Sequence, residues 1–146
     1  MRRMAAVLVL AGGCAGYDPG DAWIGEYEGA VECVGEDLDG APYEERSAQT
    51  MVIDRRRDDG RVFIASRACG IPLIVGDERI ATIPRYECDT ALPDGQPVHV
   101  IYESGGATLD GMALRVGWSG AVIYTGATRG RWAVYAGCVF EGWQAD

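Results

Sequence analysis

Side chains of alternating character run through Trp23–Val34, and this pattern limits the fold more than any other in the chain. Three glutamates lie on one side of the alternation, and the opposite side is apolar or small. Successive side chains of a β-strand point to opposite faces, whereas a helix repeats about every 3.6 residues. The pattern therefore predicts a strand with one buried face. The expected inward set is Trp23, Gly25, Tyr27, Gly29, Val31 and Cys33, and the outward set is Ile24, Glu26, Glu28, Ala30, Glu32 and Val34.

Strand patterns continue along the chain, separated by turn sequences and by two longer expected loops, Gly35–Glu45 and Asp89–Pro97. No window of eleven residues has helical periodicity, and the 21 glycines disfavour a long helix. We predict an all-β fold, a single small antiparallel up-and-down barrel of about eight strands with two disulfides, and a β-sandwich is the alternative. The further strands are expected at Ser47–Arg55, Arg61–Arg67, Ile71–Val75, Arg79–Pro84, Val98–Glu103, Ala107–Leu109, Met112–Trp118, Ala121–Thr125 and Arg131–Trp143. Tight turns are expected at Asp58-Asp59-Gly60, Gly76-Asp77, Pro93-Asp94-Gly95, Asp110-Gly111 and Ser119-Gly120.

The first strand contains Gly25-x-Tyr27-x-Gly29 preceded by Trp23. This short pattern resembles the opening strand of lipocalin-like and other calycin β-barrels, in which Gly-x-Trp begins strand one and its ring plugs the barrel floor. Here Tyr27 replaces that tryptophan, and the match ends at Gly29. The resemblance implies a barrel architecture and implies no particular ligand.

The chain begins with two arginines, the apolar run Met4–Ala11 and a few small residues that end at Cys14. This arrangement is typical of an export signal, and the apolar run is far shorter than the roughly 20 residues of a membrane-spanning helix. The segment Leu10-Ala11-Gly12-Gly13-Cys14 resembles the lipobox of bacterial lipoproteins, which are cleaved before a cysteine that carries a thioether-linked diacylglycerol. Ala11 stands where such motifs usually place Leu.

The lipobox resemblance implies that residues 1–13 are a signal peptide, removed to leave Cys14 as an acylated N-terminus. Residues 14–22, rich in turn-forming types, are then expected to be a lipid-anchored tether, and residues 23–146 the barrel domain. The resemblance to lipoproteins also implies a location in the cell envelope, at the outer membrane, because Ala15 rather than Asp follows the cysteine. An ordinary secretory signal, which would leave a periplasmic or secreted protein, is the alternative.

The chain has five cysteines, so lipidation of Cys14 leaves four for two disulfides. Exported compartments preserve such bonds, and four cysteines allow three pairings. Cys69 and Cys88 bracket a segment expected to form a hairpin, whose two ends meet. Cys33 ends the first strand on its inward face, and Cys138 lies in the last strand, which neighbours the first in a closed barrel. We therefore predict Cys69–Cys88 and Cys33–Cys138.

Acidic residues outnumber basic ones, 22 to 13, and removal of residues 1–13 would take two of the basic ones. Such an acidic surface makes a nucleic-acid partner unexpected. It also opposes adsorption to anionic lipid headgroups, so membrane attachment would come from the N-terminal acyl chains alone.

Residues suited to catalysis are sparse. The single histidine, His99, lies between Val98 and Val100 in an expected strand, so it faces away from them and is expected to be structural or solvent-facing. No Gly-x-Ser-x-Gly elbow accompanies it, and Ser119 is expected in a turn. The cysteines after Cys14 lack Cys-x-x-Cys spacing, which disfavours zinc and thioredoxin-type chemistry. We therefore expect no catalytic residues, no enzymatic activity and no cofactor.

Two charged clusters could bind ions, and for both the simpler interpretation is preferred. The acidic cluster lacks the ligand register that wraps a calcium ion, so a solvated loop and no metal are expected. The basic cluster is neutralised by neighbouring carboxylates. These clusters are Glu32, Glu36, Asp37 and Asp39, and Arg55-Arg56-Arg57 flanked by Asp54, Asp58 and Asp59.

Aromatic residues are numerous, with four Trp and seven Tyr, and the expected strand Arg131–Trp143 is apolar on both faces. Something is therefore expected to cover or bind the outside of this strand. If the barrel is filled, the protein is better interpreted as an interaction module, whereas a cavity of a few hundred Å³ would favour a ligand carrier. The large side chains expected inside are Trp23, Tyr27, Met112, Leu114, Trp118 and Phe140.

From the sequence we interpret the chain as a non-enzymatic binding or interaction module with an unknown small molecule or protein as its partner. The first alternative is a small-ligand carrier that uses the barrel interior. An inhibitor acting through the two expected loops, or a hydrolase with an unrecognised site, is the remaining alternative.

Overall fold

The computed structural model describes residues 16–37, 39–126 and 133–146, which form one short 3₁₀ helix and ten β-strands. The helix η1 spans Pro19–Trp23. The strands are β1 (Gly25–Asp37), β2 (Pro42–Arg55), β3 (Val62–Ile64), β4 (Ile71–Pro72), β5 (Ile74–Val75), β6 (Ile80–Ile83), β7 (Tyr86–Ala91), β8 (Pro97–Asp110), β9 (Ala113–Tyr124) and β10 (Ala133–Gln144). In the described part of the chain, no helix is long and apolar enough to cross a membrane.

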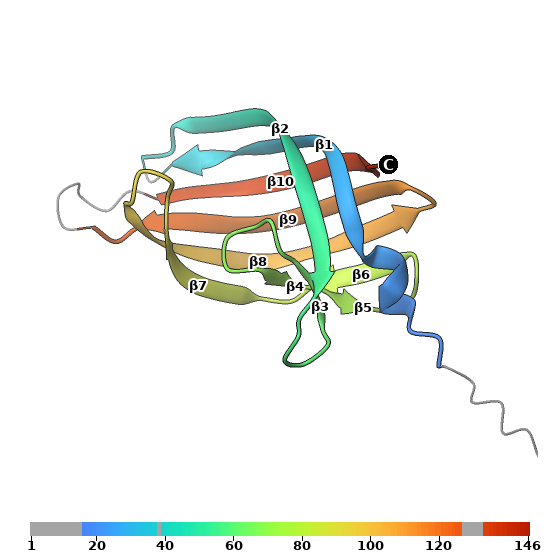
Figure 1. Ribbon diagram of the computed structural model, residues 1–146. Coiled ribbons are helices and arrows are strands. Elements are labelled where there is room, and N and C mark those ends of the chain that lie inside the picture. The colour runs from blue at the N-terminus through green and yellow to red at the C-terminus, as the bar shows by residue number, and fades with distance from the viewer. Residues whose placement is uncertain (1–15, 38, 127–132) are drawn as a thin grey trace, which may run out of the picture.

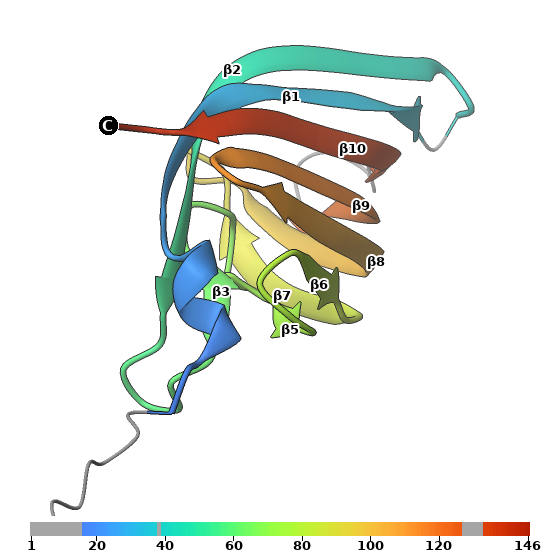
Figure 2. The ribbon, with the colours of Figure 1, turned by 90° about the vertical axis from the view of Figure 1, so that its right-hand side faces the viewer.

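The strands form one antiparallel sheet in the order β4-β3-β2-β1-β10-β9-β8-β6-β5. β7 pairs with the first half of β8 and β6 with the second half, so the two share one side of that strand (Figure 1). β1 and β10 are neighbours, with Cys33 opposite Cys138. Figure 2 shows the sheet curling into a nearly closed barrel. The predicted all-β antiparallel barrel is confirmed, with ten strands in the described residues where about eight are expected from the sequence.

Two disulfides link the barrel, one near the gap between the sheet edges and one within the paired strands. β4 and β5 lie at opposite edges of the sheet, and only Leu73 separates them in the chain. Cys69, just before β4, is disulfide-bonded to Cys88 of β7, with a Cα–Cα distance of 6.3 Å. The second disulfide joins Cys33 and Cys138 directly across β1 and β10, with a Cα–Cα distance of 4.1 Å. Both bonds have the partners that the sequence predicts.

Two regions expected as loops or turns are strand instead. β1 and β2 extend into Gly35–Glu45, and β9 runs unbroken through Ser119-Gly120. Close backbone contact explains the glycines there: a Cβ on Gly35 would lie 1.8 Å from the Tyr135 carbonyl oxygen, and one on Gly120 would lie 2.1 Å from that of Ile101. Glycine within a strand often marks such a close backbone approach rather than a turn.

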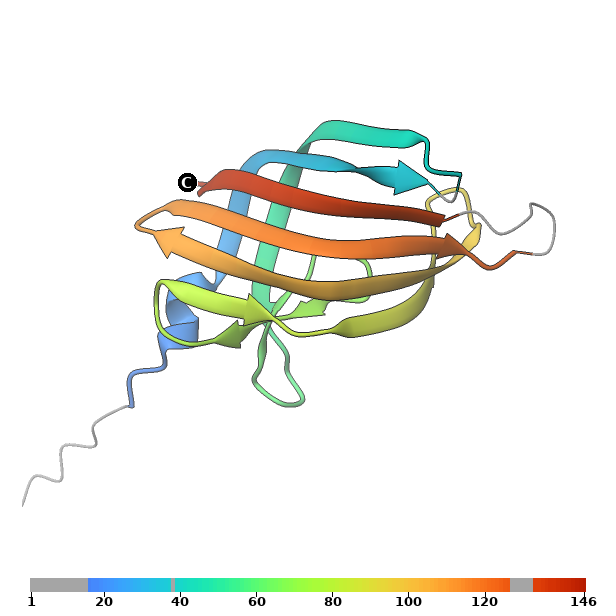
Figure 3. The ribbon, with the colours of Figure 1, turned by 180° about the vertical axis from the view of Figure 1, so that it is seen from behind.

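Strand β8 is also longer than expected, because the segments predicted separately at Val98–Glu103 and Ala107–Leu109 join across a bulge between Tyr102 and Ser104. Such bulges bend a strand and increase its twist, which helps a sheet close into a barrel. Figure 3 shows β8, β9 and β10 running side by side along this curved wall.

Three further segments differ from expectation. Ile71–Val75 is two short strands on opposite edges of the sheet, because the chain crosses the gap at Leu73. Tyr86–Ala91 is a strand, β7, so the first three residues of the loop expected at Asp89–Pro97 are strand instead. The outward residues of β7 are charged or small, and they obscure the alternation of a half-buried strand. Pro19–Trp23, expected mostly as tether, forms η1, in which the Asp18 carboxylate accepts a hydrogen bond from the Gly20 amide at 2.8 Å.

The end of the barrel next to η1 is filled with side chains. Trp23 is 0% exposed and its indole Nε1 donates to the Asp77 carbonyl oxygen at 2.9 Å. The Tyr27 hydroxyl donates to the Trp23 carbonyl oxygen at 3.1 Å, so both aromatic rings are fixed across this end. The large side chains expected inside are buried except Met112, which is 50% exposed because it lies in the turn between β8 and β9. The buried ones are Trp23, Tyr27, Leu114, Trp118 and Phe140.

Candidate functional site

A cavity of about 540 Å³ lies at the other end of the barrel, where β1 and β9 end and β8 and β10 begin. Its walls come from the inward faces of four strands, together with Tyr43 and Glu45 of β2. Residues 66–68, between β3 and β4, and residues 90–93, at the end of β7 and just after it, complete the lining. The wall residues are Cys33, Val98, Val100, Tyr102, Trp118, Gly120, Val122, Tyr124, Val134, Ala136 and Cys138.

On β1 and β10 the inward side chains become smaller toward the cavity end, which leaves space there. On β10 the inward residues pass from Phe140 through Cys138 to Ala136, and on β1 the series from Tyr27 ends at Gly35. Phe140 and Tyr27 are almost completely inaccessible, whereas Cys138 retains 8% exposure. The same barrel is therefore a packed core at one end and an open cavity at the other.

Arg67 is the cationic side chain among the described residues that line this cavity. It lies in the connection between β3 and β4, half-buried, with its guanidinium carbon 4.5 Å from the centroid of the Trp118 ring. Its Nη1 donates to Gln49 Oε1 at 2.9 Å, and Gln49 Nε2 in turn donates to Ser47 Oγ at 3.1 Å. One amide and one aromatic face therefore fix the position of the charge.

The guanidinium of Arg67 lacks a counter-ion within the described residues. No described carboxylate lies within 4 Å of it, and its buried Nε has no hydrogen-bond partner among them. Burial lowers the pKa of Arg67, against smaller opposing effects from Tyr102 and Glu45. Arginine stays protonated despite such a shift. The cavity therefore contains a fixed positive charge whose desolvation is poorly compensated.

The nearest acidic group in the lining, Glu45, has a partner of its own. Its Oε2 accepts a hydrogen bond from the Tyr43 hydroxyl. Burial, followed by this hydrogen bond, raises the pKa of Tyr43 to about 12, so the phenol remains a donor at neutral pH. Tyr43 and Glu45 belong to the first of the two expected loops, Gly35–Glu45, and Thr90–Pro93 belong to the second, Asp89–Pro97. Both segments contribute to the cavity wall.

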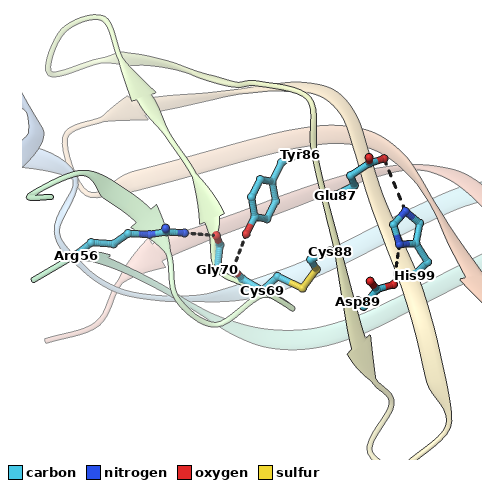
Figure 4. The surroundings of a disulfide bond; sticks show 8 residues. All are labelled: Arg56, Cys69, Gly70, Tyr86, Glu87, Cys88, Asp89 and His99. Carbon is cyan, nitrogen blue, oxygen red and sulfur yellow. Dashed lines mark hydrogen bonds and ion pairs between the residues drawn. A yellow bond between two sulfur atoms is a disulfide. The ribbon is translucent and has the colours of Figure 1, made fainter. Parts of the chain in front are cut away.

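His99 lies on the outside of the barrel, as predicted, because its strand neighbours Val98 and Val100 point inward. Its Nδ1 is 2.9 Å from Asp89 Oδ1, and its Nε2 is 3.7 Å from Glu87 Oε2 (Figure 4). The hydrogen bond to Asp89 is the main cause that raises the pKa of His99. These contacts form a surface charge cluster on β7 and β8, facing away from the cavity.

The four cysteines that the structure describes are all in disulfides, so they supply no thiol. Figure 4 shows the Cys69–Cys88 bond beside Tyr86, whose hydroxyl donates to the Cys69 carbonyl oxygen at 3.3 Å. Ser119, expected in a turn, lies within β9, and its Oγ is 3.3 Å from that of Ser104. Cys14, the predicted lipidation site, lies outside the described residues, as do Arg131 and Trp132 at the start of the expected last strand.

Neither charged cluster singled out in the sequence forms an ion site in the structure. Glu32 pairs with Arg46 at 3.1 Å, and Asp37 Oδ1 accepts from the backbone amides of Asp39 and Ala41. Across residues 16–37, 39–126 and 133–146, no three His, Cys, Asp or Glu side chains are placed to hold a metal.

Two of the three arginines of the basic run, Arg55 and Arg56, make separate contacts. Arg55 pairs with Asp18 at 3.0 Å and with Asp21 at 2.8 Å, which ties η1 to β2. Arg56 donates to the Gly70 carbonyl oxygen at 3.0 Å and lies 5.2 Å from the Phe63 ring centroid. Their roles are therefore structural, and the run does not converge on an anion.

No protein-family model matches the sequence, and neither the curated proteins nor the solved structures contain a match. The fold and the site thus define a disulfide-linked β-barrel with one filled end and one end that contains a cavity.

Sequence reasoning missed Arg67 and Gln49, because Arg67 was placed at the end of an expected strand and carried no motif. The decrease in side-chain size along the first and last strands does indicate the cavity. This decrease can be read from the sequence, because the alternation of each strand shows which residues point inward.

Proposed function

We propose that this protein is a non-enzymatic small-molecule binder, anchored to the cell envelope through Cys14, whose ligand occupies the barrel cavity. The observation that carries this proposal is the cavity itself, about 540 Å³ in volume. Ligand sites generally measure about 300–1,000 Å³ and combine an apolar lining with few polar groups. The lining here has that character, with aliphatic and aromatic walls around Arg67, Glu45 and Tyr43.

The cavity favours a carrier over an interaction module that acts through surface loops. A completely filled barrel would have left only the surface for recognition. The two segments expected to be such loops instead contribute Tyr43, Glu45 and the range 90–93 to the cavity wall. Their role is better explained as forming part of the wall around the ligand.

The position of η1 is compatible with the proposed lipid anchor. η1 precedes the filled end, and β1 then runs from Gly25 at that end toward Asp37 at the cavity end (Figure 2). An anchor at Cys14 would attach the filled end to the membrane and direct the cavity away from it. We place the anchor at the outer membrane, with attachment through acyl chains and no contribution from the acidic surface.

The test uses the exported Cys14→Ala protein, purified without detergent, and the neutral fluorophore N-phenyl-1-naphthylamine. We expect saturable binding with increased fluorescence. Ala136→Trp, which places an indole in the cavity, should weaken binding at least tenfold. The matched control is Tyr135→Trp, because Tyr135 is the preceding residue and points outward with 51% exposure.

The control should bind as tightly as the parent protein, and thermal melting should show that both variants fold. Absence of saturable binding by the parent, or equal binding by the Ala136→Trp variant, would reject the proposal.

A further inference from the structure

The ligand itself is constrained by charge. Among the described residues that line the cavity, Arg67 is cationic and Glu45 is anionic, and Glu45 is hydrogen-bonded to Tyr43. A guanidinium has five N–H donors, and a single described hydrogen bond, to Gln49, uses one of them. The cavity therefore offers unused donors and a positive charge in largely apolar surroundings.

This arrangement is unfavourable for the empty protein. A charge removed from water needs a partner to offset the loss of hydration, and an apolar residue at the same place would avoid that cost. Trp118 and Gln49 orient the guanidinium, but neither carries the negative charge that would neutralise it. A preoriented, unneutralised cation is the arrangement expected of a group that completes its interactions when a ligand binds.

We propose that Arg67 binds the carboxylate of an apolar carboxylic acid whose body fills the cavity. This inference rests on the proposed function and specifies the chemistry of its ligand. A carboxylate matches the planar guanidinium and carries the single negative charge that one arginine neutralises. A phosphate dianion would remain partly uncompensated, with the Glu45 carboxylate in the same lining. The aliphatic and aromatic walls formed by residues such as Val100, Val122 and Trp118 suit an apolar body.

The experiment compares each acid with its uncharged methyl ester on the exported Cys14→Ala protein. The probes are cis-parinaric acid, for an aliphatic chain, and 1-pyrenebutyric acid, for a fused aromatic body. At least one acid should bind about 10- to 100-fold more tightly than its ester, the range expected for a hydrogen-bonded charge. Which acid shows the preference identifies the kind of apolar body.

Arg67→Met should remove the preference for the acid and leave the affinity for the ester within about threefold. Arg67→Lys keeps the positive charge but loses the planar guanidinium with its paired donors, so it should retain part of the preference for the acid. The matched control is Arg56→Met, because Arg56 also stacks on an aromatic ring but does not line the cavity. It should keep the full preference for the acid.

Equal binding of acid and ester by the parent protein, for both probe pairs, would overturn the inference without any variant. If N-phenyl-1-naphthylamine still binds in that case, the proposed function stands and the carboxylate assignment fails. Retention of the full acid preference in a folded Arg67→Met protein would also overturn the assignment.

Discussion

Removal of either disulfide should destabilise the protein, and the two losses should differ by a predictable amount. Cys33–Cys138 closes a chain segment with a sequence separation of 105 residues, and Cys69–Cys88 one of 19. A cross-link mainly restricts the unfolded chain, and its effect grows with the logarithm of loop length. The chain-entropy estimates are about 4.7 and about 3.2 kcal/mol, so the long bridge should contribute about 1.5 kcal/mol more.

The native environment should widen this difference. Cys33 and Cys138 are both buried among core residues, so replacing them with Ala also leaves unfilled space. Cys69 and Cys88 are half-buried, so their replacement removes less packing.

The two double variants, Cys33→Ala/Cys138→Ala and Cys69→Ala/Cys88→Ala, are compared by urea unfolding followed by circular dichroism. The free energy of unfolding should be lower for the first by at least about 1.5 kcal/mol. Equal values, or a less stable second variant, would refute the chain-entropy reasoning. That result would mean that Cys69–Cys88 stabilises the native barrel by holding its sheet edges together, and that this effect exceeds the difference in chain entropy.

The other predictions concern the anchor, the filled end and the surface histidine. Cys14→Ala should move the protein from the membrane to the soluble exported fraction, and a variant that stays membrane-bound would contradict lipidation. Trp23→Ala should lower the free energy of unfolding by about 3–5 kcal/mol in urea titrations, because the ring is fully buried. The control Trp143→Ala, at 68% exposure, should change it by less than about 0.5 kcal/mol. The Asp89 carboxylate raises the pKa of His99, so their contact stabilises the folded protein when His99 is protonated. This stabilisation is fully present below the ordinary histidine pKa and is lost as the pH rises through the raised pKa. Asp89→Asn should lower the His99 pKa in an NMR titration, and an unchanged titration would exclude that cause.

The fold could be predicted largely because β-strand alternation is local. The parity of Trp23, Tyr27 and Cys33 placed one face of the first strand inward, and that parity gave the partner of Cys33 once the barrel closed. The errors lie where a residue type has two structural uses. Gly35 and Gly120 were interpreted as loop and turn residues, but they permit close backbone contact between strands.

The site was less predictable because it depends on contacts between distant segments. Arg67 reaches Gln49 and Trp118, which lie in other parts of the chain, and no local pattern specifies that contact. The cavity likewise depends on β1 and β10, which lie far apart in the chain, carrying their small inward side chains at the same end of the barrel. Lipidation at Cys14 remains a prediction from its sequence context.

The measurement that tests the central claim most directly is a methyl NMR titration of the exported Cys14→Ala protein with N-phenyl-1-naphthylamine. If the ligand occupies the barrel interior, the methyl resonances of Val100, Val122 and Val134 should shift, because these residues line the cavity. Ile53 and Ile71, buried outside the cavity lining, should change little. Shifts confined to exposed residues such as Val34, or no saturable shifts at all, would contradict the assignment of the cavity as the binding site.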